Sequence, residues 1–238
     1  MKFIHLTDTH VIGDALLYGQ DSAARLRAAV ASINAEHVDA GFVVLTGDMT
    51  HWGDAAAYAR LKYEIKKLKM PVHLMVGNHD DRAAFGEAFP EIPRDENGFV
   101  QSGFDTPFGR FLLLDTKDPE THAGAYCLAR QAWLDRELDQ TDGPIILFMH
   151  HPPFKTGIAS MDRIMLHDAE KFYEVIAPHK PRIRHLFLGH VHRAIFGNWR
   201  GMSYSCMRGL NHQVVLEMDG PADRIAGNFE PPAYGVVT

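Results

Sequence analysis

Five short apolar runs recur along this chain, and polar side chains of the kinds that bind metal ions follow each of them. The runs are residues 3–6, 43–45, 73–76, 145–148 and 185–188. The side chains that follow them are, in order, Asp8 and His10, Asp48, Asn78 and His79, His150, and His190 and His192. Runs of this length predict buried β-strands, and the carboxyl ends of parallel strands meet at one edge of a sheet. We therefore expect these side chains to meet in one crevice, although they come from opposite ends of the sequence.

Segments with helical periodicity separate the first three apolar runs. A helix is expected from about residue 21 to 36, and a second begins after the capping residue Asp54. The second helix carries a buried stripe with three-and-four spacing, which includes Leu61 and Ile65. A shorter helix is expected at 81–89. This alternation predicts an α/β fold, in which right-handed crossovers join parallel strands and helices cover the sheet on both faces.

The second half of the chain mixes strands and helices. Strands are expected at residues 99–103, 110–114, 144–149, 182–188, 194–199 and 202–207, and helices at 130–140 and 168–176. The first two of these strands are close in sequence and predict a hairpin. Two mixed sheets packed together, with helices on the outside, accommodate this order of elements.

No repeat, low-complexity tract or Ser/Gly-rich linker divides the chain, so we expect a single domain over residues 1–238. Prolines at positions 221, 231 and 232 mark the C-terminal segment. From about residue 218 to 238 we therefore expect an extended excursion over the surface, which returns to the sheet at 234–237.

Charge and cysteine content narrow the function classes. The chain has 24 Lys and Arg against 30 Asp and Glu, so its net charge of −6 repels nucleic-acid polymers. Cys127 and Cys206 are far apart and form neither a disulfide framework nor a thiolate zinc site, which fits a cytoplasmic protein. Asp8 interrupts the first apolar run too early for a signal peptide, and no run approaches the roughly 20 residues that cross a bilayer. We expect neither a nucleic-acid partner nor a membrane partner.

The polar residues after the strands form a mixed set of metal ligands. Oxygen donors are Asp8, Asp48 and Asn78, and imidazole donors are His10, His150, His190 and His192. Seven donors exceed what one metal needs, so two divalent ions are expected, and Fe, Mn, Zn and Co all suit such a set. Asp48 stands alone in its loop and is the natural bridge between ions about 3.5–4 Å apart. A hydroxide that bridges the same pair is the expected nucleophile, because divalent metals lower the pKa of bound water to about 7.

The motifs themselves resemble those of a known family. They are Asp-Thr-His at 8–10, Gly-Asp at 47–48, Gly-Asn-His-Asp at 77–80, His-His-Pro-Pro at 150–153 and Gly-His-Val-His at 189–192. Five blocks in this order resemble the calcineurin-like metallophosphoesterase superfamily over nearly the whole chain. The blocks at 77–81 and 150–154 look most like those of bacterial class III cyclic-nucleotide phosphodiesterases and the related glycerophosphodiester phosphodiesterase.

The resemblance implies a ligand set for each metal. The first metal would be bound by Asp8, His10, Asp48 and His192, and the second by Asp48, Asn78, His150 and His190. His79 would be the catalytic residue rather than a ligand, and would hydrogen-bond the phosphoryl oxygen or the leaving group. The implied fold is a βαβαβ-based sandwich of two mixed sheets flanked by helices. The implied function is metal-dependent hydrolysis of small phosphodiesters, either cyclic nucleotides or glycerophosphodiesters.

One departure from the family's phosphatases bears on the substrate. Protein phosphatases of the superfamily place an Arg shortly after the bridging Asp, whereas residues 47–53 here read Gly-Asp-Met-Thr-His-Trp-Gly. A diester carries one negative charge and needs less cationic help than a monoester, so the absence favours diesters. A phosphomonoesterase or nuclease of the same fold remains the alternative. A non-catalytic protein-binding scaffold is the alternative of another class, and a homo-oligomer is left open.

Residues beside the motifs have roles that the sequence leaves open. His51 and His151 are expected either to support the ligands or to contact substrate, and Asp80 either to orient His79 or to cap the next helix. The loop 154–167 shows no regular pattern, and in relatives the equivalent loop borders the substrate. The histidines outside any motif, which we expect at the surface, are His37, His122, His167, His179 and His212.

Overall fold

The first of two mixed sheets contains the N-terminal strands. In the computed structural model, which describes residues 1–238, its strands are β1 (Phe3–Leu6), β2 (Val43–Thr46), β3 (Val72–Met75) and β12 (Gly235–Val237). Their order is β12-β1-β2-β3. The strands β1, β2 and β3 are parallel, and β12 pairs antiparallel with β1. The C-terminal segment therefore returns to the sheet where the sequence predicted it.

The second sheet has six strands in the order β4-β5-β6-β7-β9-β8. They are β4 (Ser102–Thr106), β5 (Gly109–Leu114), β6 (Ile145–Met149), β7 (Ile183–Leu188), β8 (Ile195–Trp199) and β9 (Met202–Cys206). The inner strands β5, β6, β7 and β9 are parallel. The two edge strands, β4 and β8, pair antiparallel with their neighbours.

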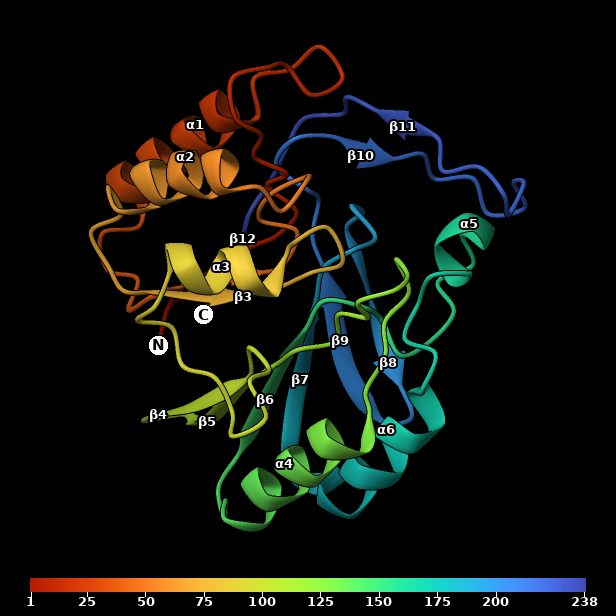
Figure 1. The fold of residues 1–238 in the computed structure, drawn as a ribbon. Coiled ribbons are helices and arrows are strands. Elements are labelled where there is room, and N and C mark those ends of the chain that lie inside the picture. The colour runs from red at the N-terminus through yellow and green to blue at the C-terminus, as the bar shows by residue number, and fades with distance from the viewer.

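Helices cover the outer face of each sheet (Figure 1). The helices α1 (Ser22–Glu36), α2 (Ala55–Ile65) and α3 (Arg82–Ala88) lie against the first sheet, and α4 (Leu128–Asp139) and α6 (Ala169–Ile176) against the second. A 3-10 helix, η1 (Ala177–Arg182), joins α6 to β7. Asp21, Asp54 and Asp81 cap α1, α2 and α3, each by accepting a hydrogen bond from the backbone three residues on. None of the helices is long and apolar enough to cross a membrane.

Aromatic rings fill the space between the two sheets. Phe3 contributes from the first sheet, and Phe111, Phe148 and Phe187 from the second. The rings of Phe148 and Phe187 stack with centroids 4.9 Å apart. Alternate residues of β1, such as Ile4, pack instead against the helices, so this strand is buried on both faces. The predicted sandwich of two mixed sheets with flanking helices is confirmed.

Two local predictions were wrong, and one element was missed. The strand β4 starts at Ser102 rather than at 99, because the backbone N–H of Val100 donates to the Asp115 carboxylate (3.0 Å) instead of to a ladder. The loop 154–167 contains a short helix, α5 (Ala159–Asp162), and the Asp162 carboxylate accepts backbone hydrogen bonds from the start of this loop. A small hairpin of β10 (Gln213–Val214) and β11 (Gly227–Asn228) was not expected at all.

Candidate metal centre

Five loops bring the sequence-predicted ligands together at the carboxyl ends of β1, β2, β3, β6 and β7. Most of these ligands have an unusual backbone: φ is positive at Asp8, His10, Asp48, His190 and His192, between 43° and 70°. Left-handed conformations cost non-glycine residues on the order of 1–3 kcal/mol each, and they concentrate at functional sites. These backbone conformations direct the side chains into the site at a cost in conformational energy.

Glycines allow these loops to pack against one another. A Cβ atom on Gly77 would lie 2.2 Å from Asp48 Oδ1, and one on Gly47 would lie 2.6 Å from His150 Nδ1. A Cβ atom on Gly189 would lie 2.4 Å from the hydroxyl oxygen of Thr7. The glycines before the ligands are required because backbone and ligand approach too closely for any side chain.

The first cluster consists of Asp8, His10, Asp48 and His192, all buried, with ligand atoms within 4.8 Å of one another. The Nε2 atoms of His10 and His192 are 3.0 Å apart. His192 Nε2 lies 3.2 Å from Asp8 Oδ1, and His10 Nε2 lies 3.6 Å from Asp48 Oδ2. Two imidazoles and two carboxylates thus converge on one point, as in a site for a divalent ion.

The second cluster lies on the other side of Asp48. Asp48 Oδ1 is 3.4 Å from His150 Nε2, and the same Nε2 atom is 3.1 Å from Asn78 Oδ1. His190 is buried here, and its Nε2 atom has no hydrogen-bond partner. A buried polar atom without a partner is rare in folded proteins and calls for a ligand. The two oxygens of Asp48 therefore face different clusters.

Hydrogen bonds fix which nitrogen each imidazole turns toward the centre. His192 Nδ1 donates to the carbonyl of His212 (2.8 Å), and His150 Nδ1 donates to the carbonyl of Thr46 (2.8 Å). Each bond leaves the Nε2 atom directed inward. Backbone carbonyls commonly orient metal-ligating histidines in this way.

Burial governs the ionisation of these groups. It lowers the pKa of His10 and His190 well below the ordinary value, so both imidazoles are neutral and keep a lone pair for a metal. Burial by itself raises the pKa of Asp48, but the imidazoles of His150 and His79 outweigh it and hold that pKa well below its usual range. Burial likewise opposes a charge on His150, yet Asp48 raises the pKa of His150 to about 9. The buried carboxylate requires positive charge beside it, and the cluster fits divalent metal ions.

His79 lies beside both clusters and lines the pocket. Its backbone N–H donates to Asp48 Oδ1 (2.9 Å), and its Nδ1 donates to the carbonyl of His51 (2.9 Å). The rings of His51 and His79 stack with centroids 4.7 Å apart, and His51 Nδ1 is 3.0 Å from His10 Nδ1. These contacts leave the Nε2 atom of His79 facing the cavity, so the structure places His51 in support of both His79 and a ligand.

Two histidines expected at the surface, outside any motif, belong to this site. The ring centroid of His212 lies 4.6 Å from that of His192 and 4.9 Å from that of His10. His122 is solvent-exposed, but its Nδ1 accepts a hydrogen bond from Asn78 Nδ2 (2.9 Å), which turns the Asn78 oxygen toward His150. Neither histidine follows a strand of the expected series, so the sequence carried no signal for them. The other histidines of that group, His37, His167 and His179, do not line the pocket.

Asp80 has a role that the sequence did not predict. Its carboxylate accepts hydrogen bonds from the backbone N–H groups of Met49, Thr50 and Gly77. Asp81, not Asp80, caps the following helix. Burial, followed by the charge of Asp48, raises the pKa of Asp80 to about 6. Asp80 therefore ties the Asp48 loop to the Asn78 loop instead of orienting the His79 ring.

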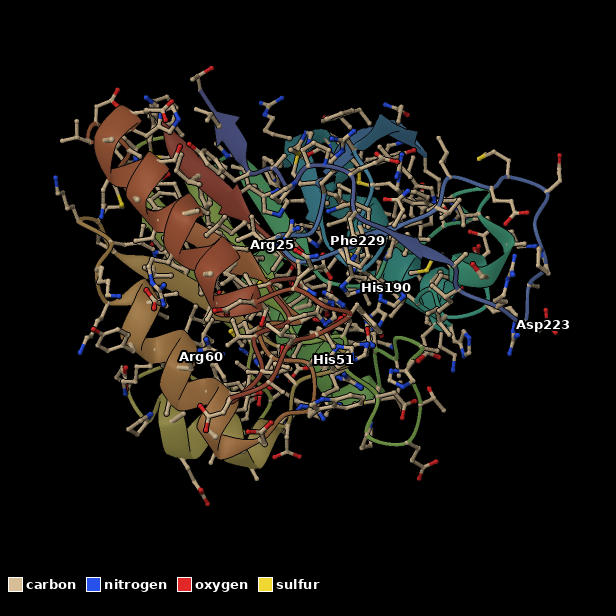
Figure 2. The ribbon with its side chains drawn as sticks, turned by 90° about the horizontal axis from the view of Figure 1, so that it is seen from above. Arg25, His51, Arg60, His190, Asp223 and Phe229 are labelled. Carbon is tan, nitrogen blue, oxygen red and sulfur yellow. The ribbon has the colours of Figure 1, made fainter.

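The centre opens into a cavity of about 650 Å³. No lysine or arginine lines the cavity. One side is formed by His51, His79, His122 and His212 together with five of the candidate ligands, which are His10, Asp48, Asn78, His190 and His192. His51 and His190, which are labelled in Figure 2, follow strands of different sheets and line the same cavity. Lys117 Nζ is engaged by the carbonyl oxygen of Asn78 (2.9 Å). Candidate metal ligands and imidazoles thus line the pocket, and no lysine or arginine does.

Comparison with known proteins identifies the family. The family model described as "Calcineurin-like phosphoesterase" matches residues 1–194. The chain is also 45% identical over 244 residues to a probable cyclic nucleotide phosphodiesterase of Rhodopseudomonas palustris, an alignment that covers 100% of this chain and 88% of the relative. The chain belongs to the calcineurin-like phosphoesterase family. The resemblance inferred from the five motifs is confirmed, and so is the expected enzyme class, a phosphoesterase hydrolase.

More distant relatives agree with this assignment. A probable glycerophosphodiester phosphodiesterase of Arcobacter nitrofigilis is 28% identical over 240 residues, which covers 98% of this chain and 86% of that relative. Among solved structures, a dimetal phosphatase from Danio rerio superposes with a TM-score of 0.70 at 17% identity, over 95% of this chain and 90% of that one. At this identity the superposition supports the fold alone, and it agrees with the two-sheet sandwich described above.

Proposed function

We propose that this calcineurin-like phosphoesterase hydrolyses small phosphodiesters, cyclic nucleotides or glycerophosphodiesters, with two divalent metal ions. One ion would be bound by Asp8, His10, Asp48 and His192, and the other by Asp48, Asn78, His150 and His190. The observation that carries the proposal is the position of Asp48, whose Oδ2 is 3.6 Å from His10 Nε2 and whose Oδ1 is 3.4 Å from His150 Nε2. A carboxylate that faces two ligand clusters is suited to bridge two ions.

The protein's own groups divide the remaining work. Bound divalent ions would supply a hydroxide nucleophile at neutral pH and offset the charge that develops on the phosphoryl oxygens. In its doubly protonated form, His79 would give the Nε2 proton to the leaving alkoxide, because Nε2 faces the cavity while the Nδ1–H is engaged by the His51 carbonyl (2.9 Å). The neutral ring that remains keeps this Nδ1–H···O bond, so proton transfer leaves His79 in a hydrogen-bonded tautomer. His51, stacked on His79, would hold the ring in place.

The pocket lining supports diesters over monoesters. A phosphomonoester is largely a dianion, and the cavity contains no lysine or arginine to meet the second charge. The two sequence relatives, a probable cyclic nucleotide phosphodiesterase and a probable glycerophosphodiester phosphodiesterase, point the same way. The net charge of −6 disfavours nucleic-acid polymers as substrates. Both cysteines are free, which suits a reducing cytoplasm, where we place the activity.

A comparison of two aryl substrates tests the preference for diesters. With Mn²⁺ added to the purified protein, we expect kcat/KM for bis(p-nitrophenyl) phosphate to exceed that for p-nitrophenyl phosphate. The two substrates share a leaving group, so the ratio reports the charge that the pocket accepts. An equal or reversed preference would overturn the diester assignment and favour a phosphomonoesterase. Absence of both activities with Mn²⁺, Fe²⁺, Zn²⁺ and Co²⁺ would leave the protein-binding scaffold as the better explanation.

A further inference from the structure

The cavity has a second, chemically different side. Part of its wall is apolar, and this part comes from two segments that supply no candidate ligand. The side chains of this apolar wall are Met161 and Ile164 at α5, Val214 on β10, and Ile225 and Phe229 beside β11. Figure 2 shows Phe229 next to His190 near the centre of the view, while Asp223 lies at the outer end of the same hairpin. A polar, metal-binding floor and an apolar wall therefore face one space.

The hairpin is held by contacts on both sides of the cavity. Near its base, Arg193 donates to the carbonyl of Val214 (3.1 Å) and pairs with Glu230 (2.9 Å). Toward its outer end, Arg163 of the α5 region donates to the carbonyl of Ala222 (2.8 Å). The hairpin thus spans from the second sheet to α5, as Figure 1 shows. Its apolar wall is largely formed before any ligand arrives, which is the usual condition of a small-molecule site.

The apolar wall exposes large side chains to water at the pocket mouth. Ile225 is 52% exposed and Phe229 is 51% exposed, although both line the cavity. Covering such side chains with an apolar ligand surface stabilises a complex by about 25 cal/mol per Å². A glycerol headgroup offers hydroxyls and no flat apolar face. A heteroaromatic base offers two such faces, and an aromatic ring beside it stacks without regard to the identity of the base.

We infer that the apolar wall binds the nucleobase of a cyclic nucleotide, and that Phe229 and Ile225 determine specificity for nucleotide diesters over glycerophosphodiesters. The inference rests on the proposed phosphodiesterase function, and adds which substrate class the pocket selects. The phosphate would lie against the metal ligands, and the base would extend toward β11. A cavity of about 650 Å³ lies within the range of roughly 300–1,000 Å³ that small-molecule sites occupy.

Substitution of Phe229 tests the inference with two natural diesters. We expect Phe229→Ala to lower kcat/KM for 3′,5′-cyclic AMP about tenfold or more, mainly through KM, since stacking is equally strong in ground and transition states. For glycerophosphoethanolamine we expect less than about a threefold change. Phe229→Tyr keeps the ring and should retain the activity toward cyclic AMP. Ile225→Ala should act in the same direction as Phe229→Ala, with a smaller effect.

Leu216 provides a matched control on the same hairpin, because it is 55% exposed and does not line the cavity. Leu216→Ala should leave both substrates within about twofold of wild type. A binding readout separates recognition from chemistry: calorimetry with the Rp phosphorothioate of cyclic AMP should show about a tenfold weaker Kd for Phe229→Ala and no change for Leu216→Ala.

The outcomes distinguish this inference from the proposed function. If the wild type prefers glycerophosphoethanolamine, or if Phe229→Ala slows both diesters equally, the apolar wall does not bind the base selectively. The phosphodiesterase assignment stands in either case. If the wild type hydrolyses no diester with any of the four metals, the proposed function fails first, and this inference fails with it. A selective loss of cyclic AMP turnover and of phosphorothioate binding in Phe229→Ala supports both.

Discussion

Removal of the His79 side chain separates proton donation from metal binding. The bond from this position to Asp48 Oδ1 is made by the backbone N–H (2.9 Å), so His79→Ala keeps it and should keep its metal content. What the substitution removes is the Nε2 atom that faces the cavity. General-acid help contributes roughly 10²–10⁴-fold and follows Brønsted behaviour, so the loss depends on how basic the leaving group is.

The expected effect therefore differs between substrates. The p-nitrophenolate ion leaves unaided, so His79→Ala should change kcat for bis(p-nitrophenyl) phosphate little. The alkoxide of ribose or glycerol needs a proton, so kcat for cyclic AMP or glycerophosphoethanolamine should fall roughly 10²-fold or more, equivalent to about 2.7 kcal/mol. His79→Gln places an amide near the Nε2 position but provides no acid, and it should resemble His79→Ala.

The assay is steady-state kinetics on both leaving-group classes, with metal content measured on the same samples. His192→Ala is the control: it removes a proposed ligand, should impair both classes together, and should recover in part with added metal. Equal slowing of aryl and alkyl diesters by His79→Ala would mean that His79 binds the phosphoryl group instead. Loss of a metal from His79→Ala would refute the division between Asn78 as ligand and His79 as acid.

Two further predictions concern stability. Burial lowers the pKa of His5 from 6.5 to about 3. As the pH falls from 6.5 toward 3, His5 is therefore protonated in the unfolded chain before it is protonated in the folded one, and the free energy of unfolding decreases. In the wild type, His5 Nε2 lies 2.9 Å from Thr46 Oγ1, and His5→Gln keeps a hydrogen-bonding partner for that hydroxyl. Between pH 6.5 and 5 the free energy of unfolding of His5→Gln, measured by urea titration, should fall less steeply than that of wild type, by up to about 1.4 kcal/mol per pH unit. Parallel profiles for the two proteins would contradict this prediction. Arg82 forms a two-pronged ion pair with fully buried Asp115 (2.7 Å in both bonds), and Arg130 Nη1 lies 3.8 Å from the same carboxylate. Arg82→Ala should destabilise the fold by about 3 kcal/mol in the same titration. A loss below about 1 kcal/mol would show that Arg130 alone satisfies the carboxylate.

Much of this architecture follows from local sequence features. Helices begin after Asp21 and Asp54, where the sequence predicted them, because a side-chain oxygen satisfies free N–H groups at a helix start whatever the tertiary context. The ligand motifs meet in one centre because parallel strands direct their carboxyl ends to one edge. The helix caps depend only on neighbouring residues in the sequence, and the convergence of the ligand motifs depends only on strand direction.

The missed features depend on contacts between distant segments. The strand β4 is offset because Val100 bonds to Asp115, fifteen residues away. The hairpin of β10 and β11 has a two-residue ladder and is braced by Arg193 and Arg163 from other loops. His212, the residue before β10, lies beside His192 and His10 at the candidate metal centre. Periodicity and turn residues are local features of the sequence, so they do not predict contacts between segments that are distant along the chain.

Metal content of the wild type and of Asp48→Ala tests the central claim, a binuclear centre bridged by one carboxylate. The account predicts two equivalents of divalent metal per chain in the wild type. Asn78→Ala should lose mainly one of them, recoverable with excess metal, whereas Asp48→Ala should lose occupancy at both sites together with essentially all activity. Two tightly held metals in purified Asp48→Ala, measured by plasma emission spectrometry, would contradict the bridging assignment.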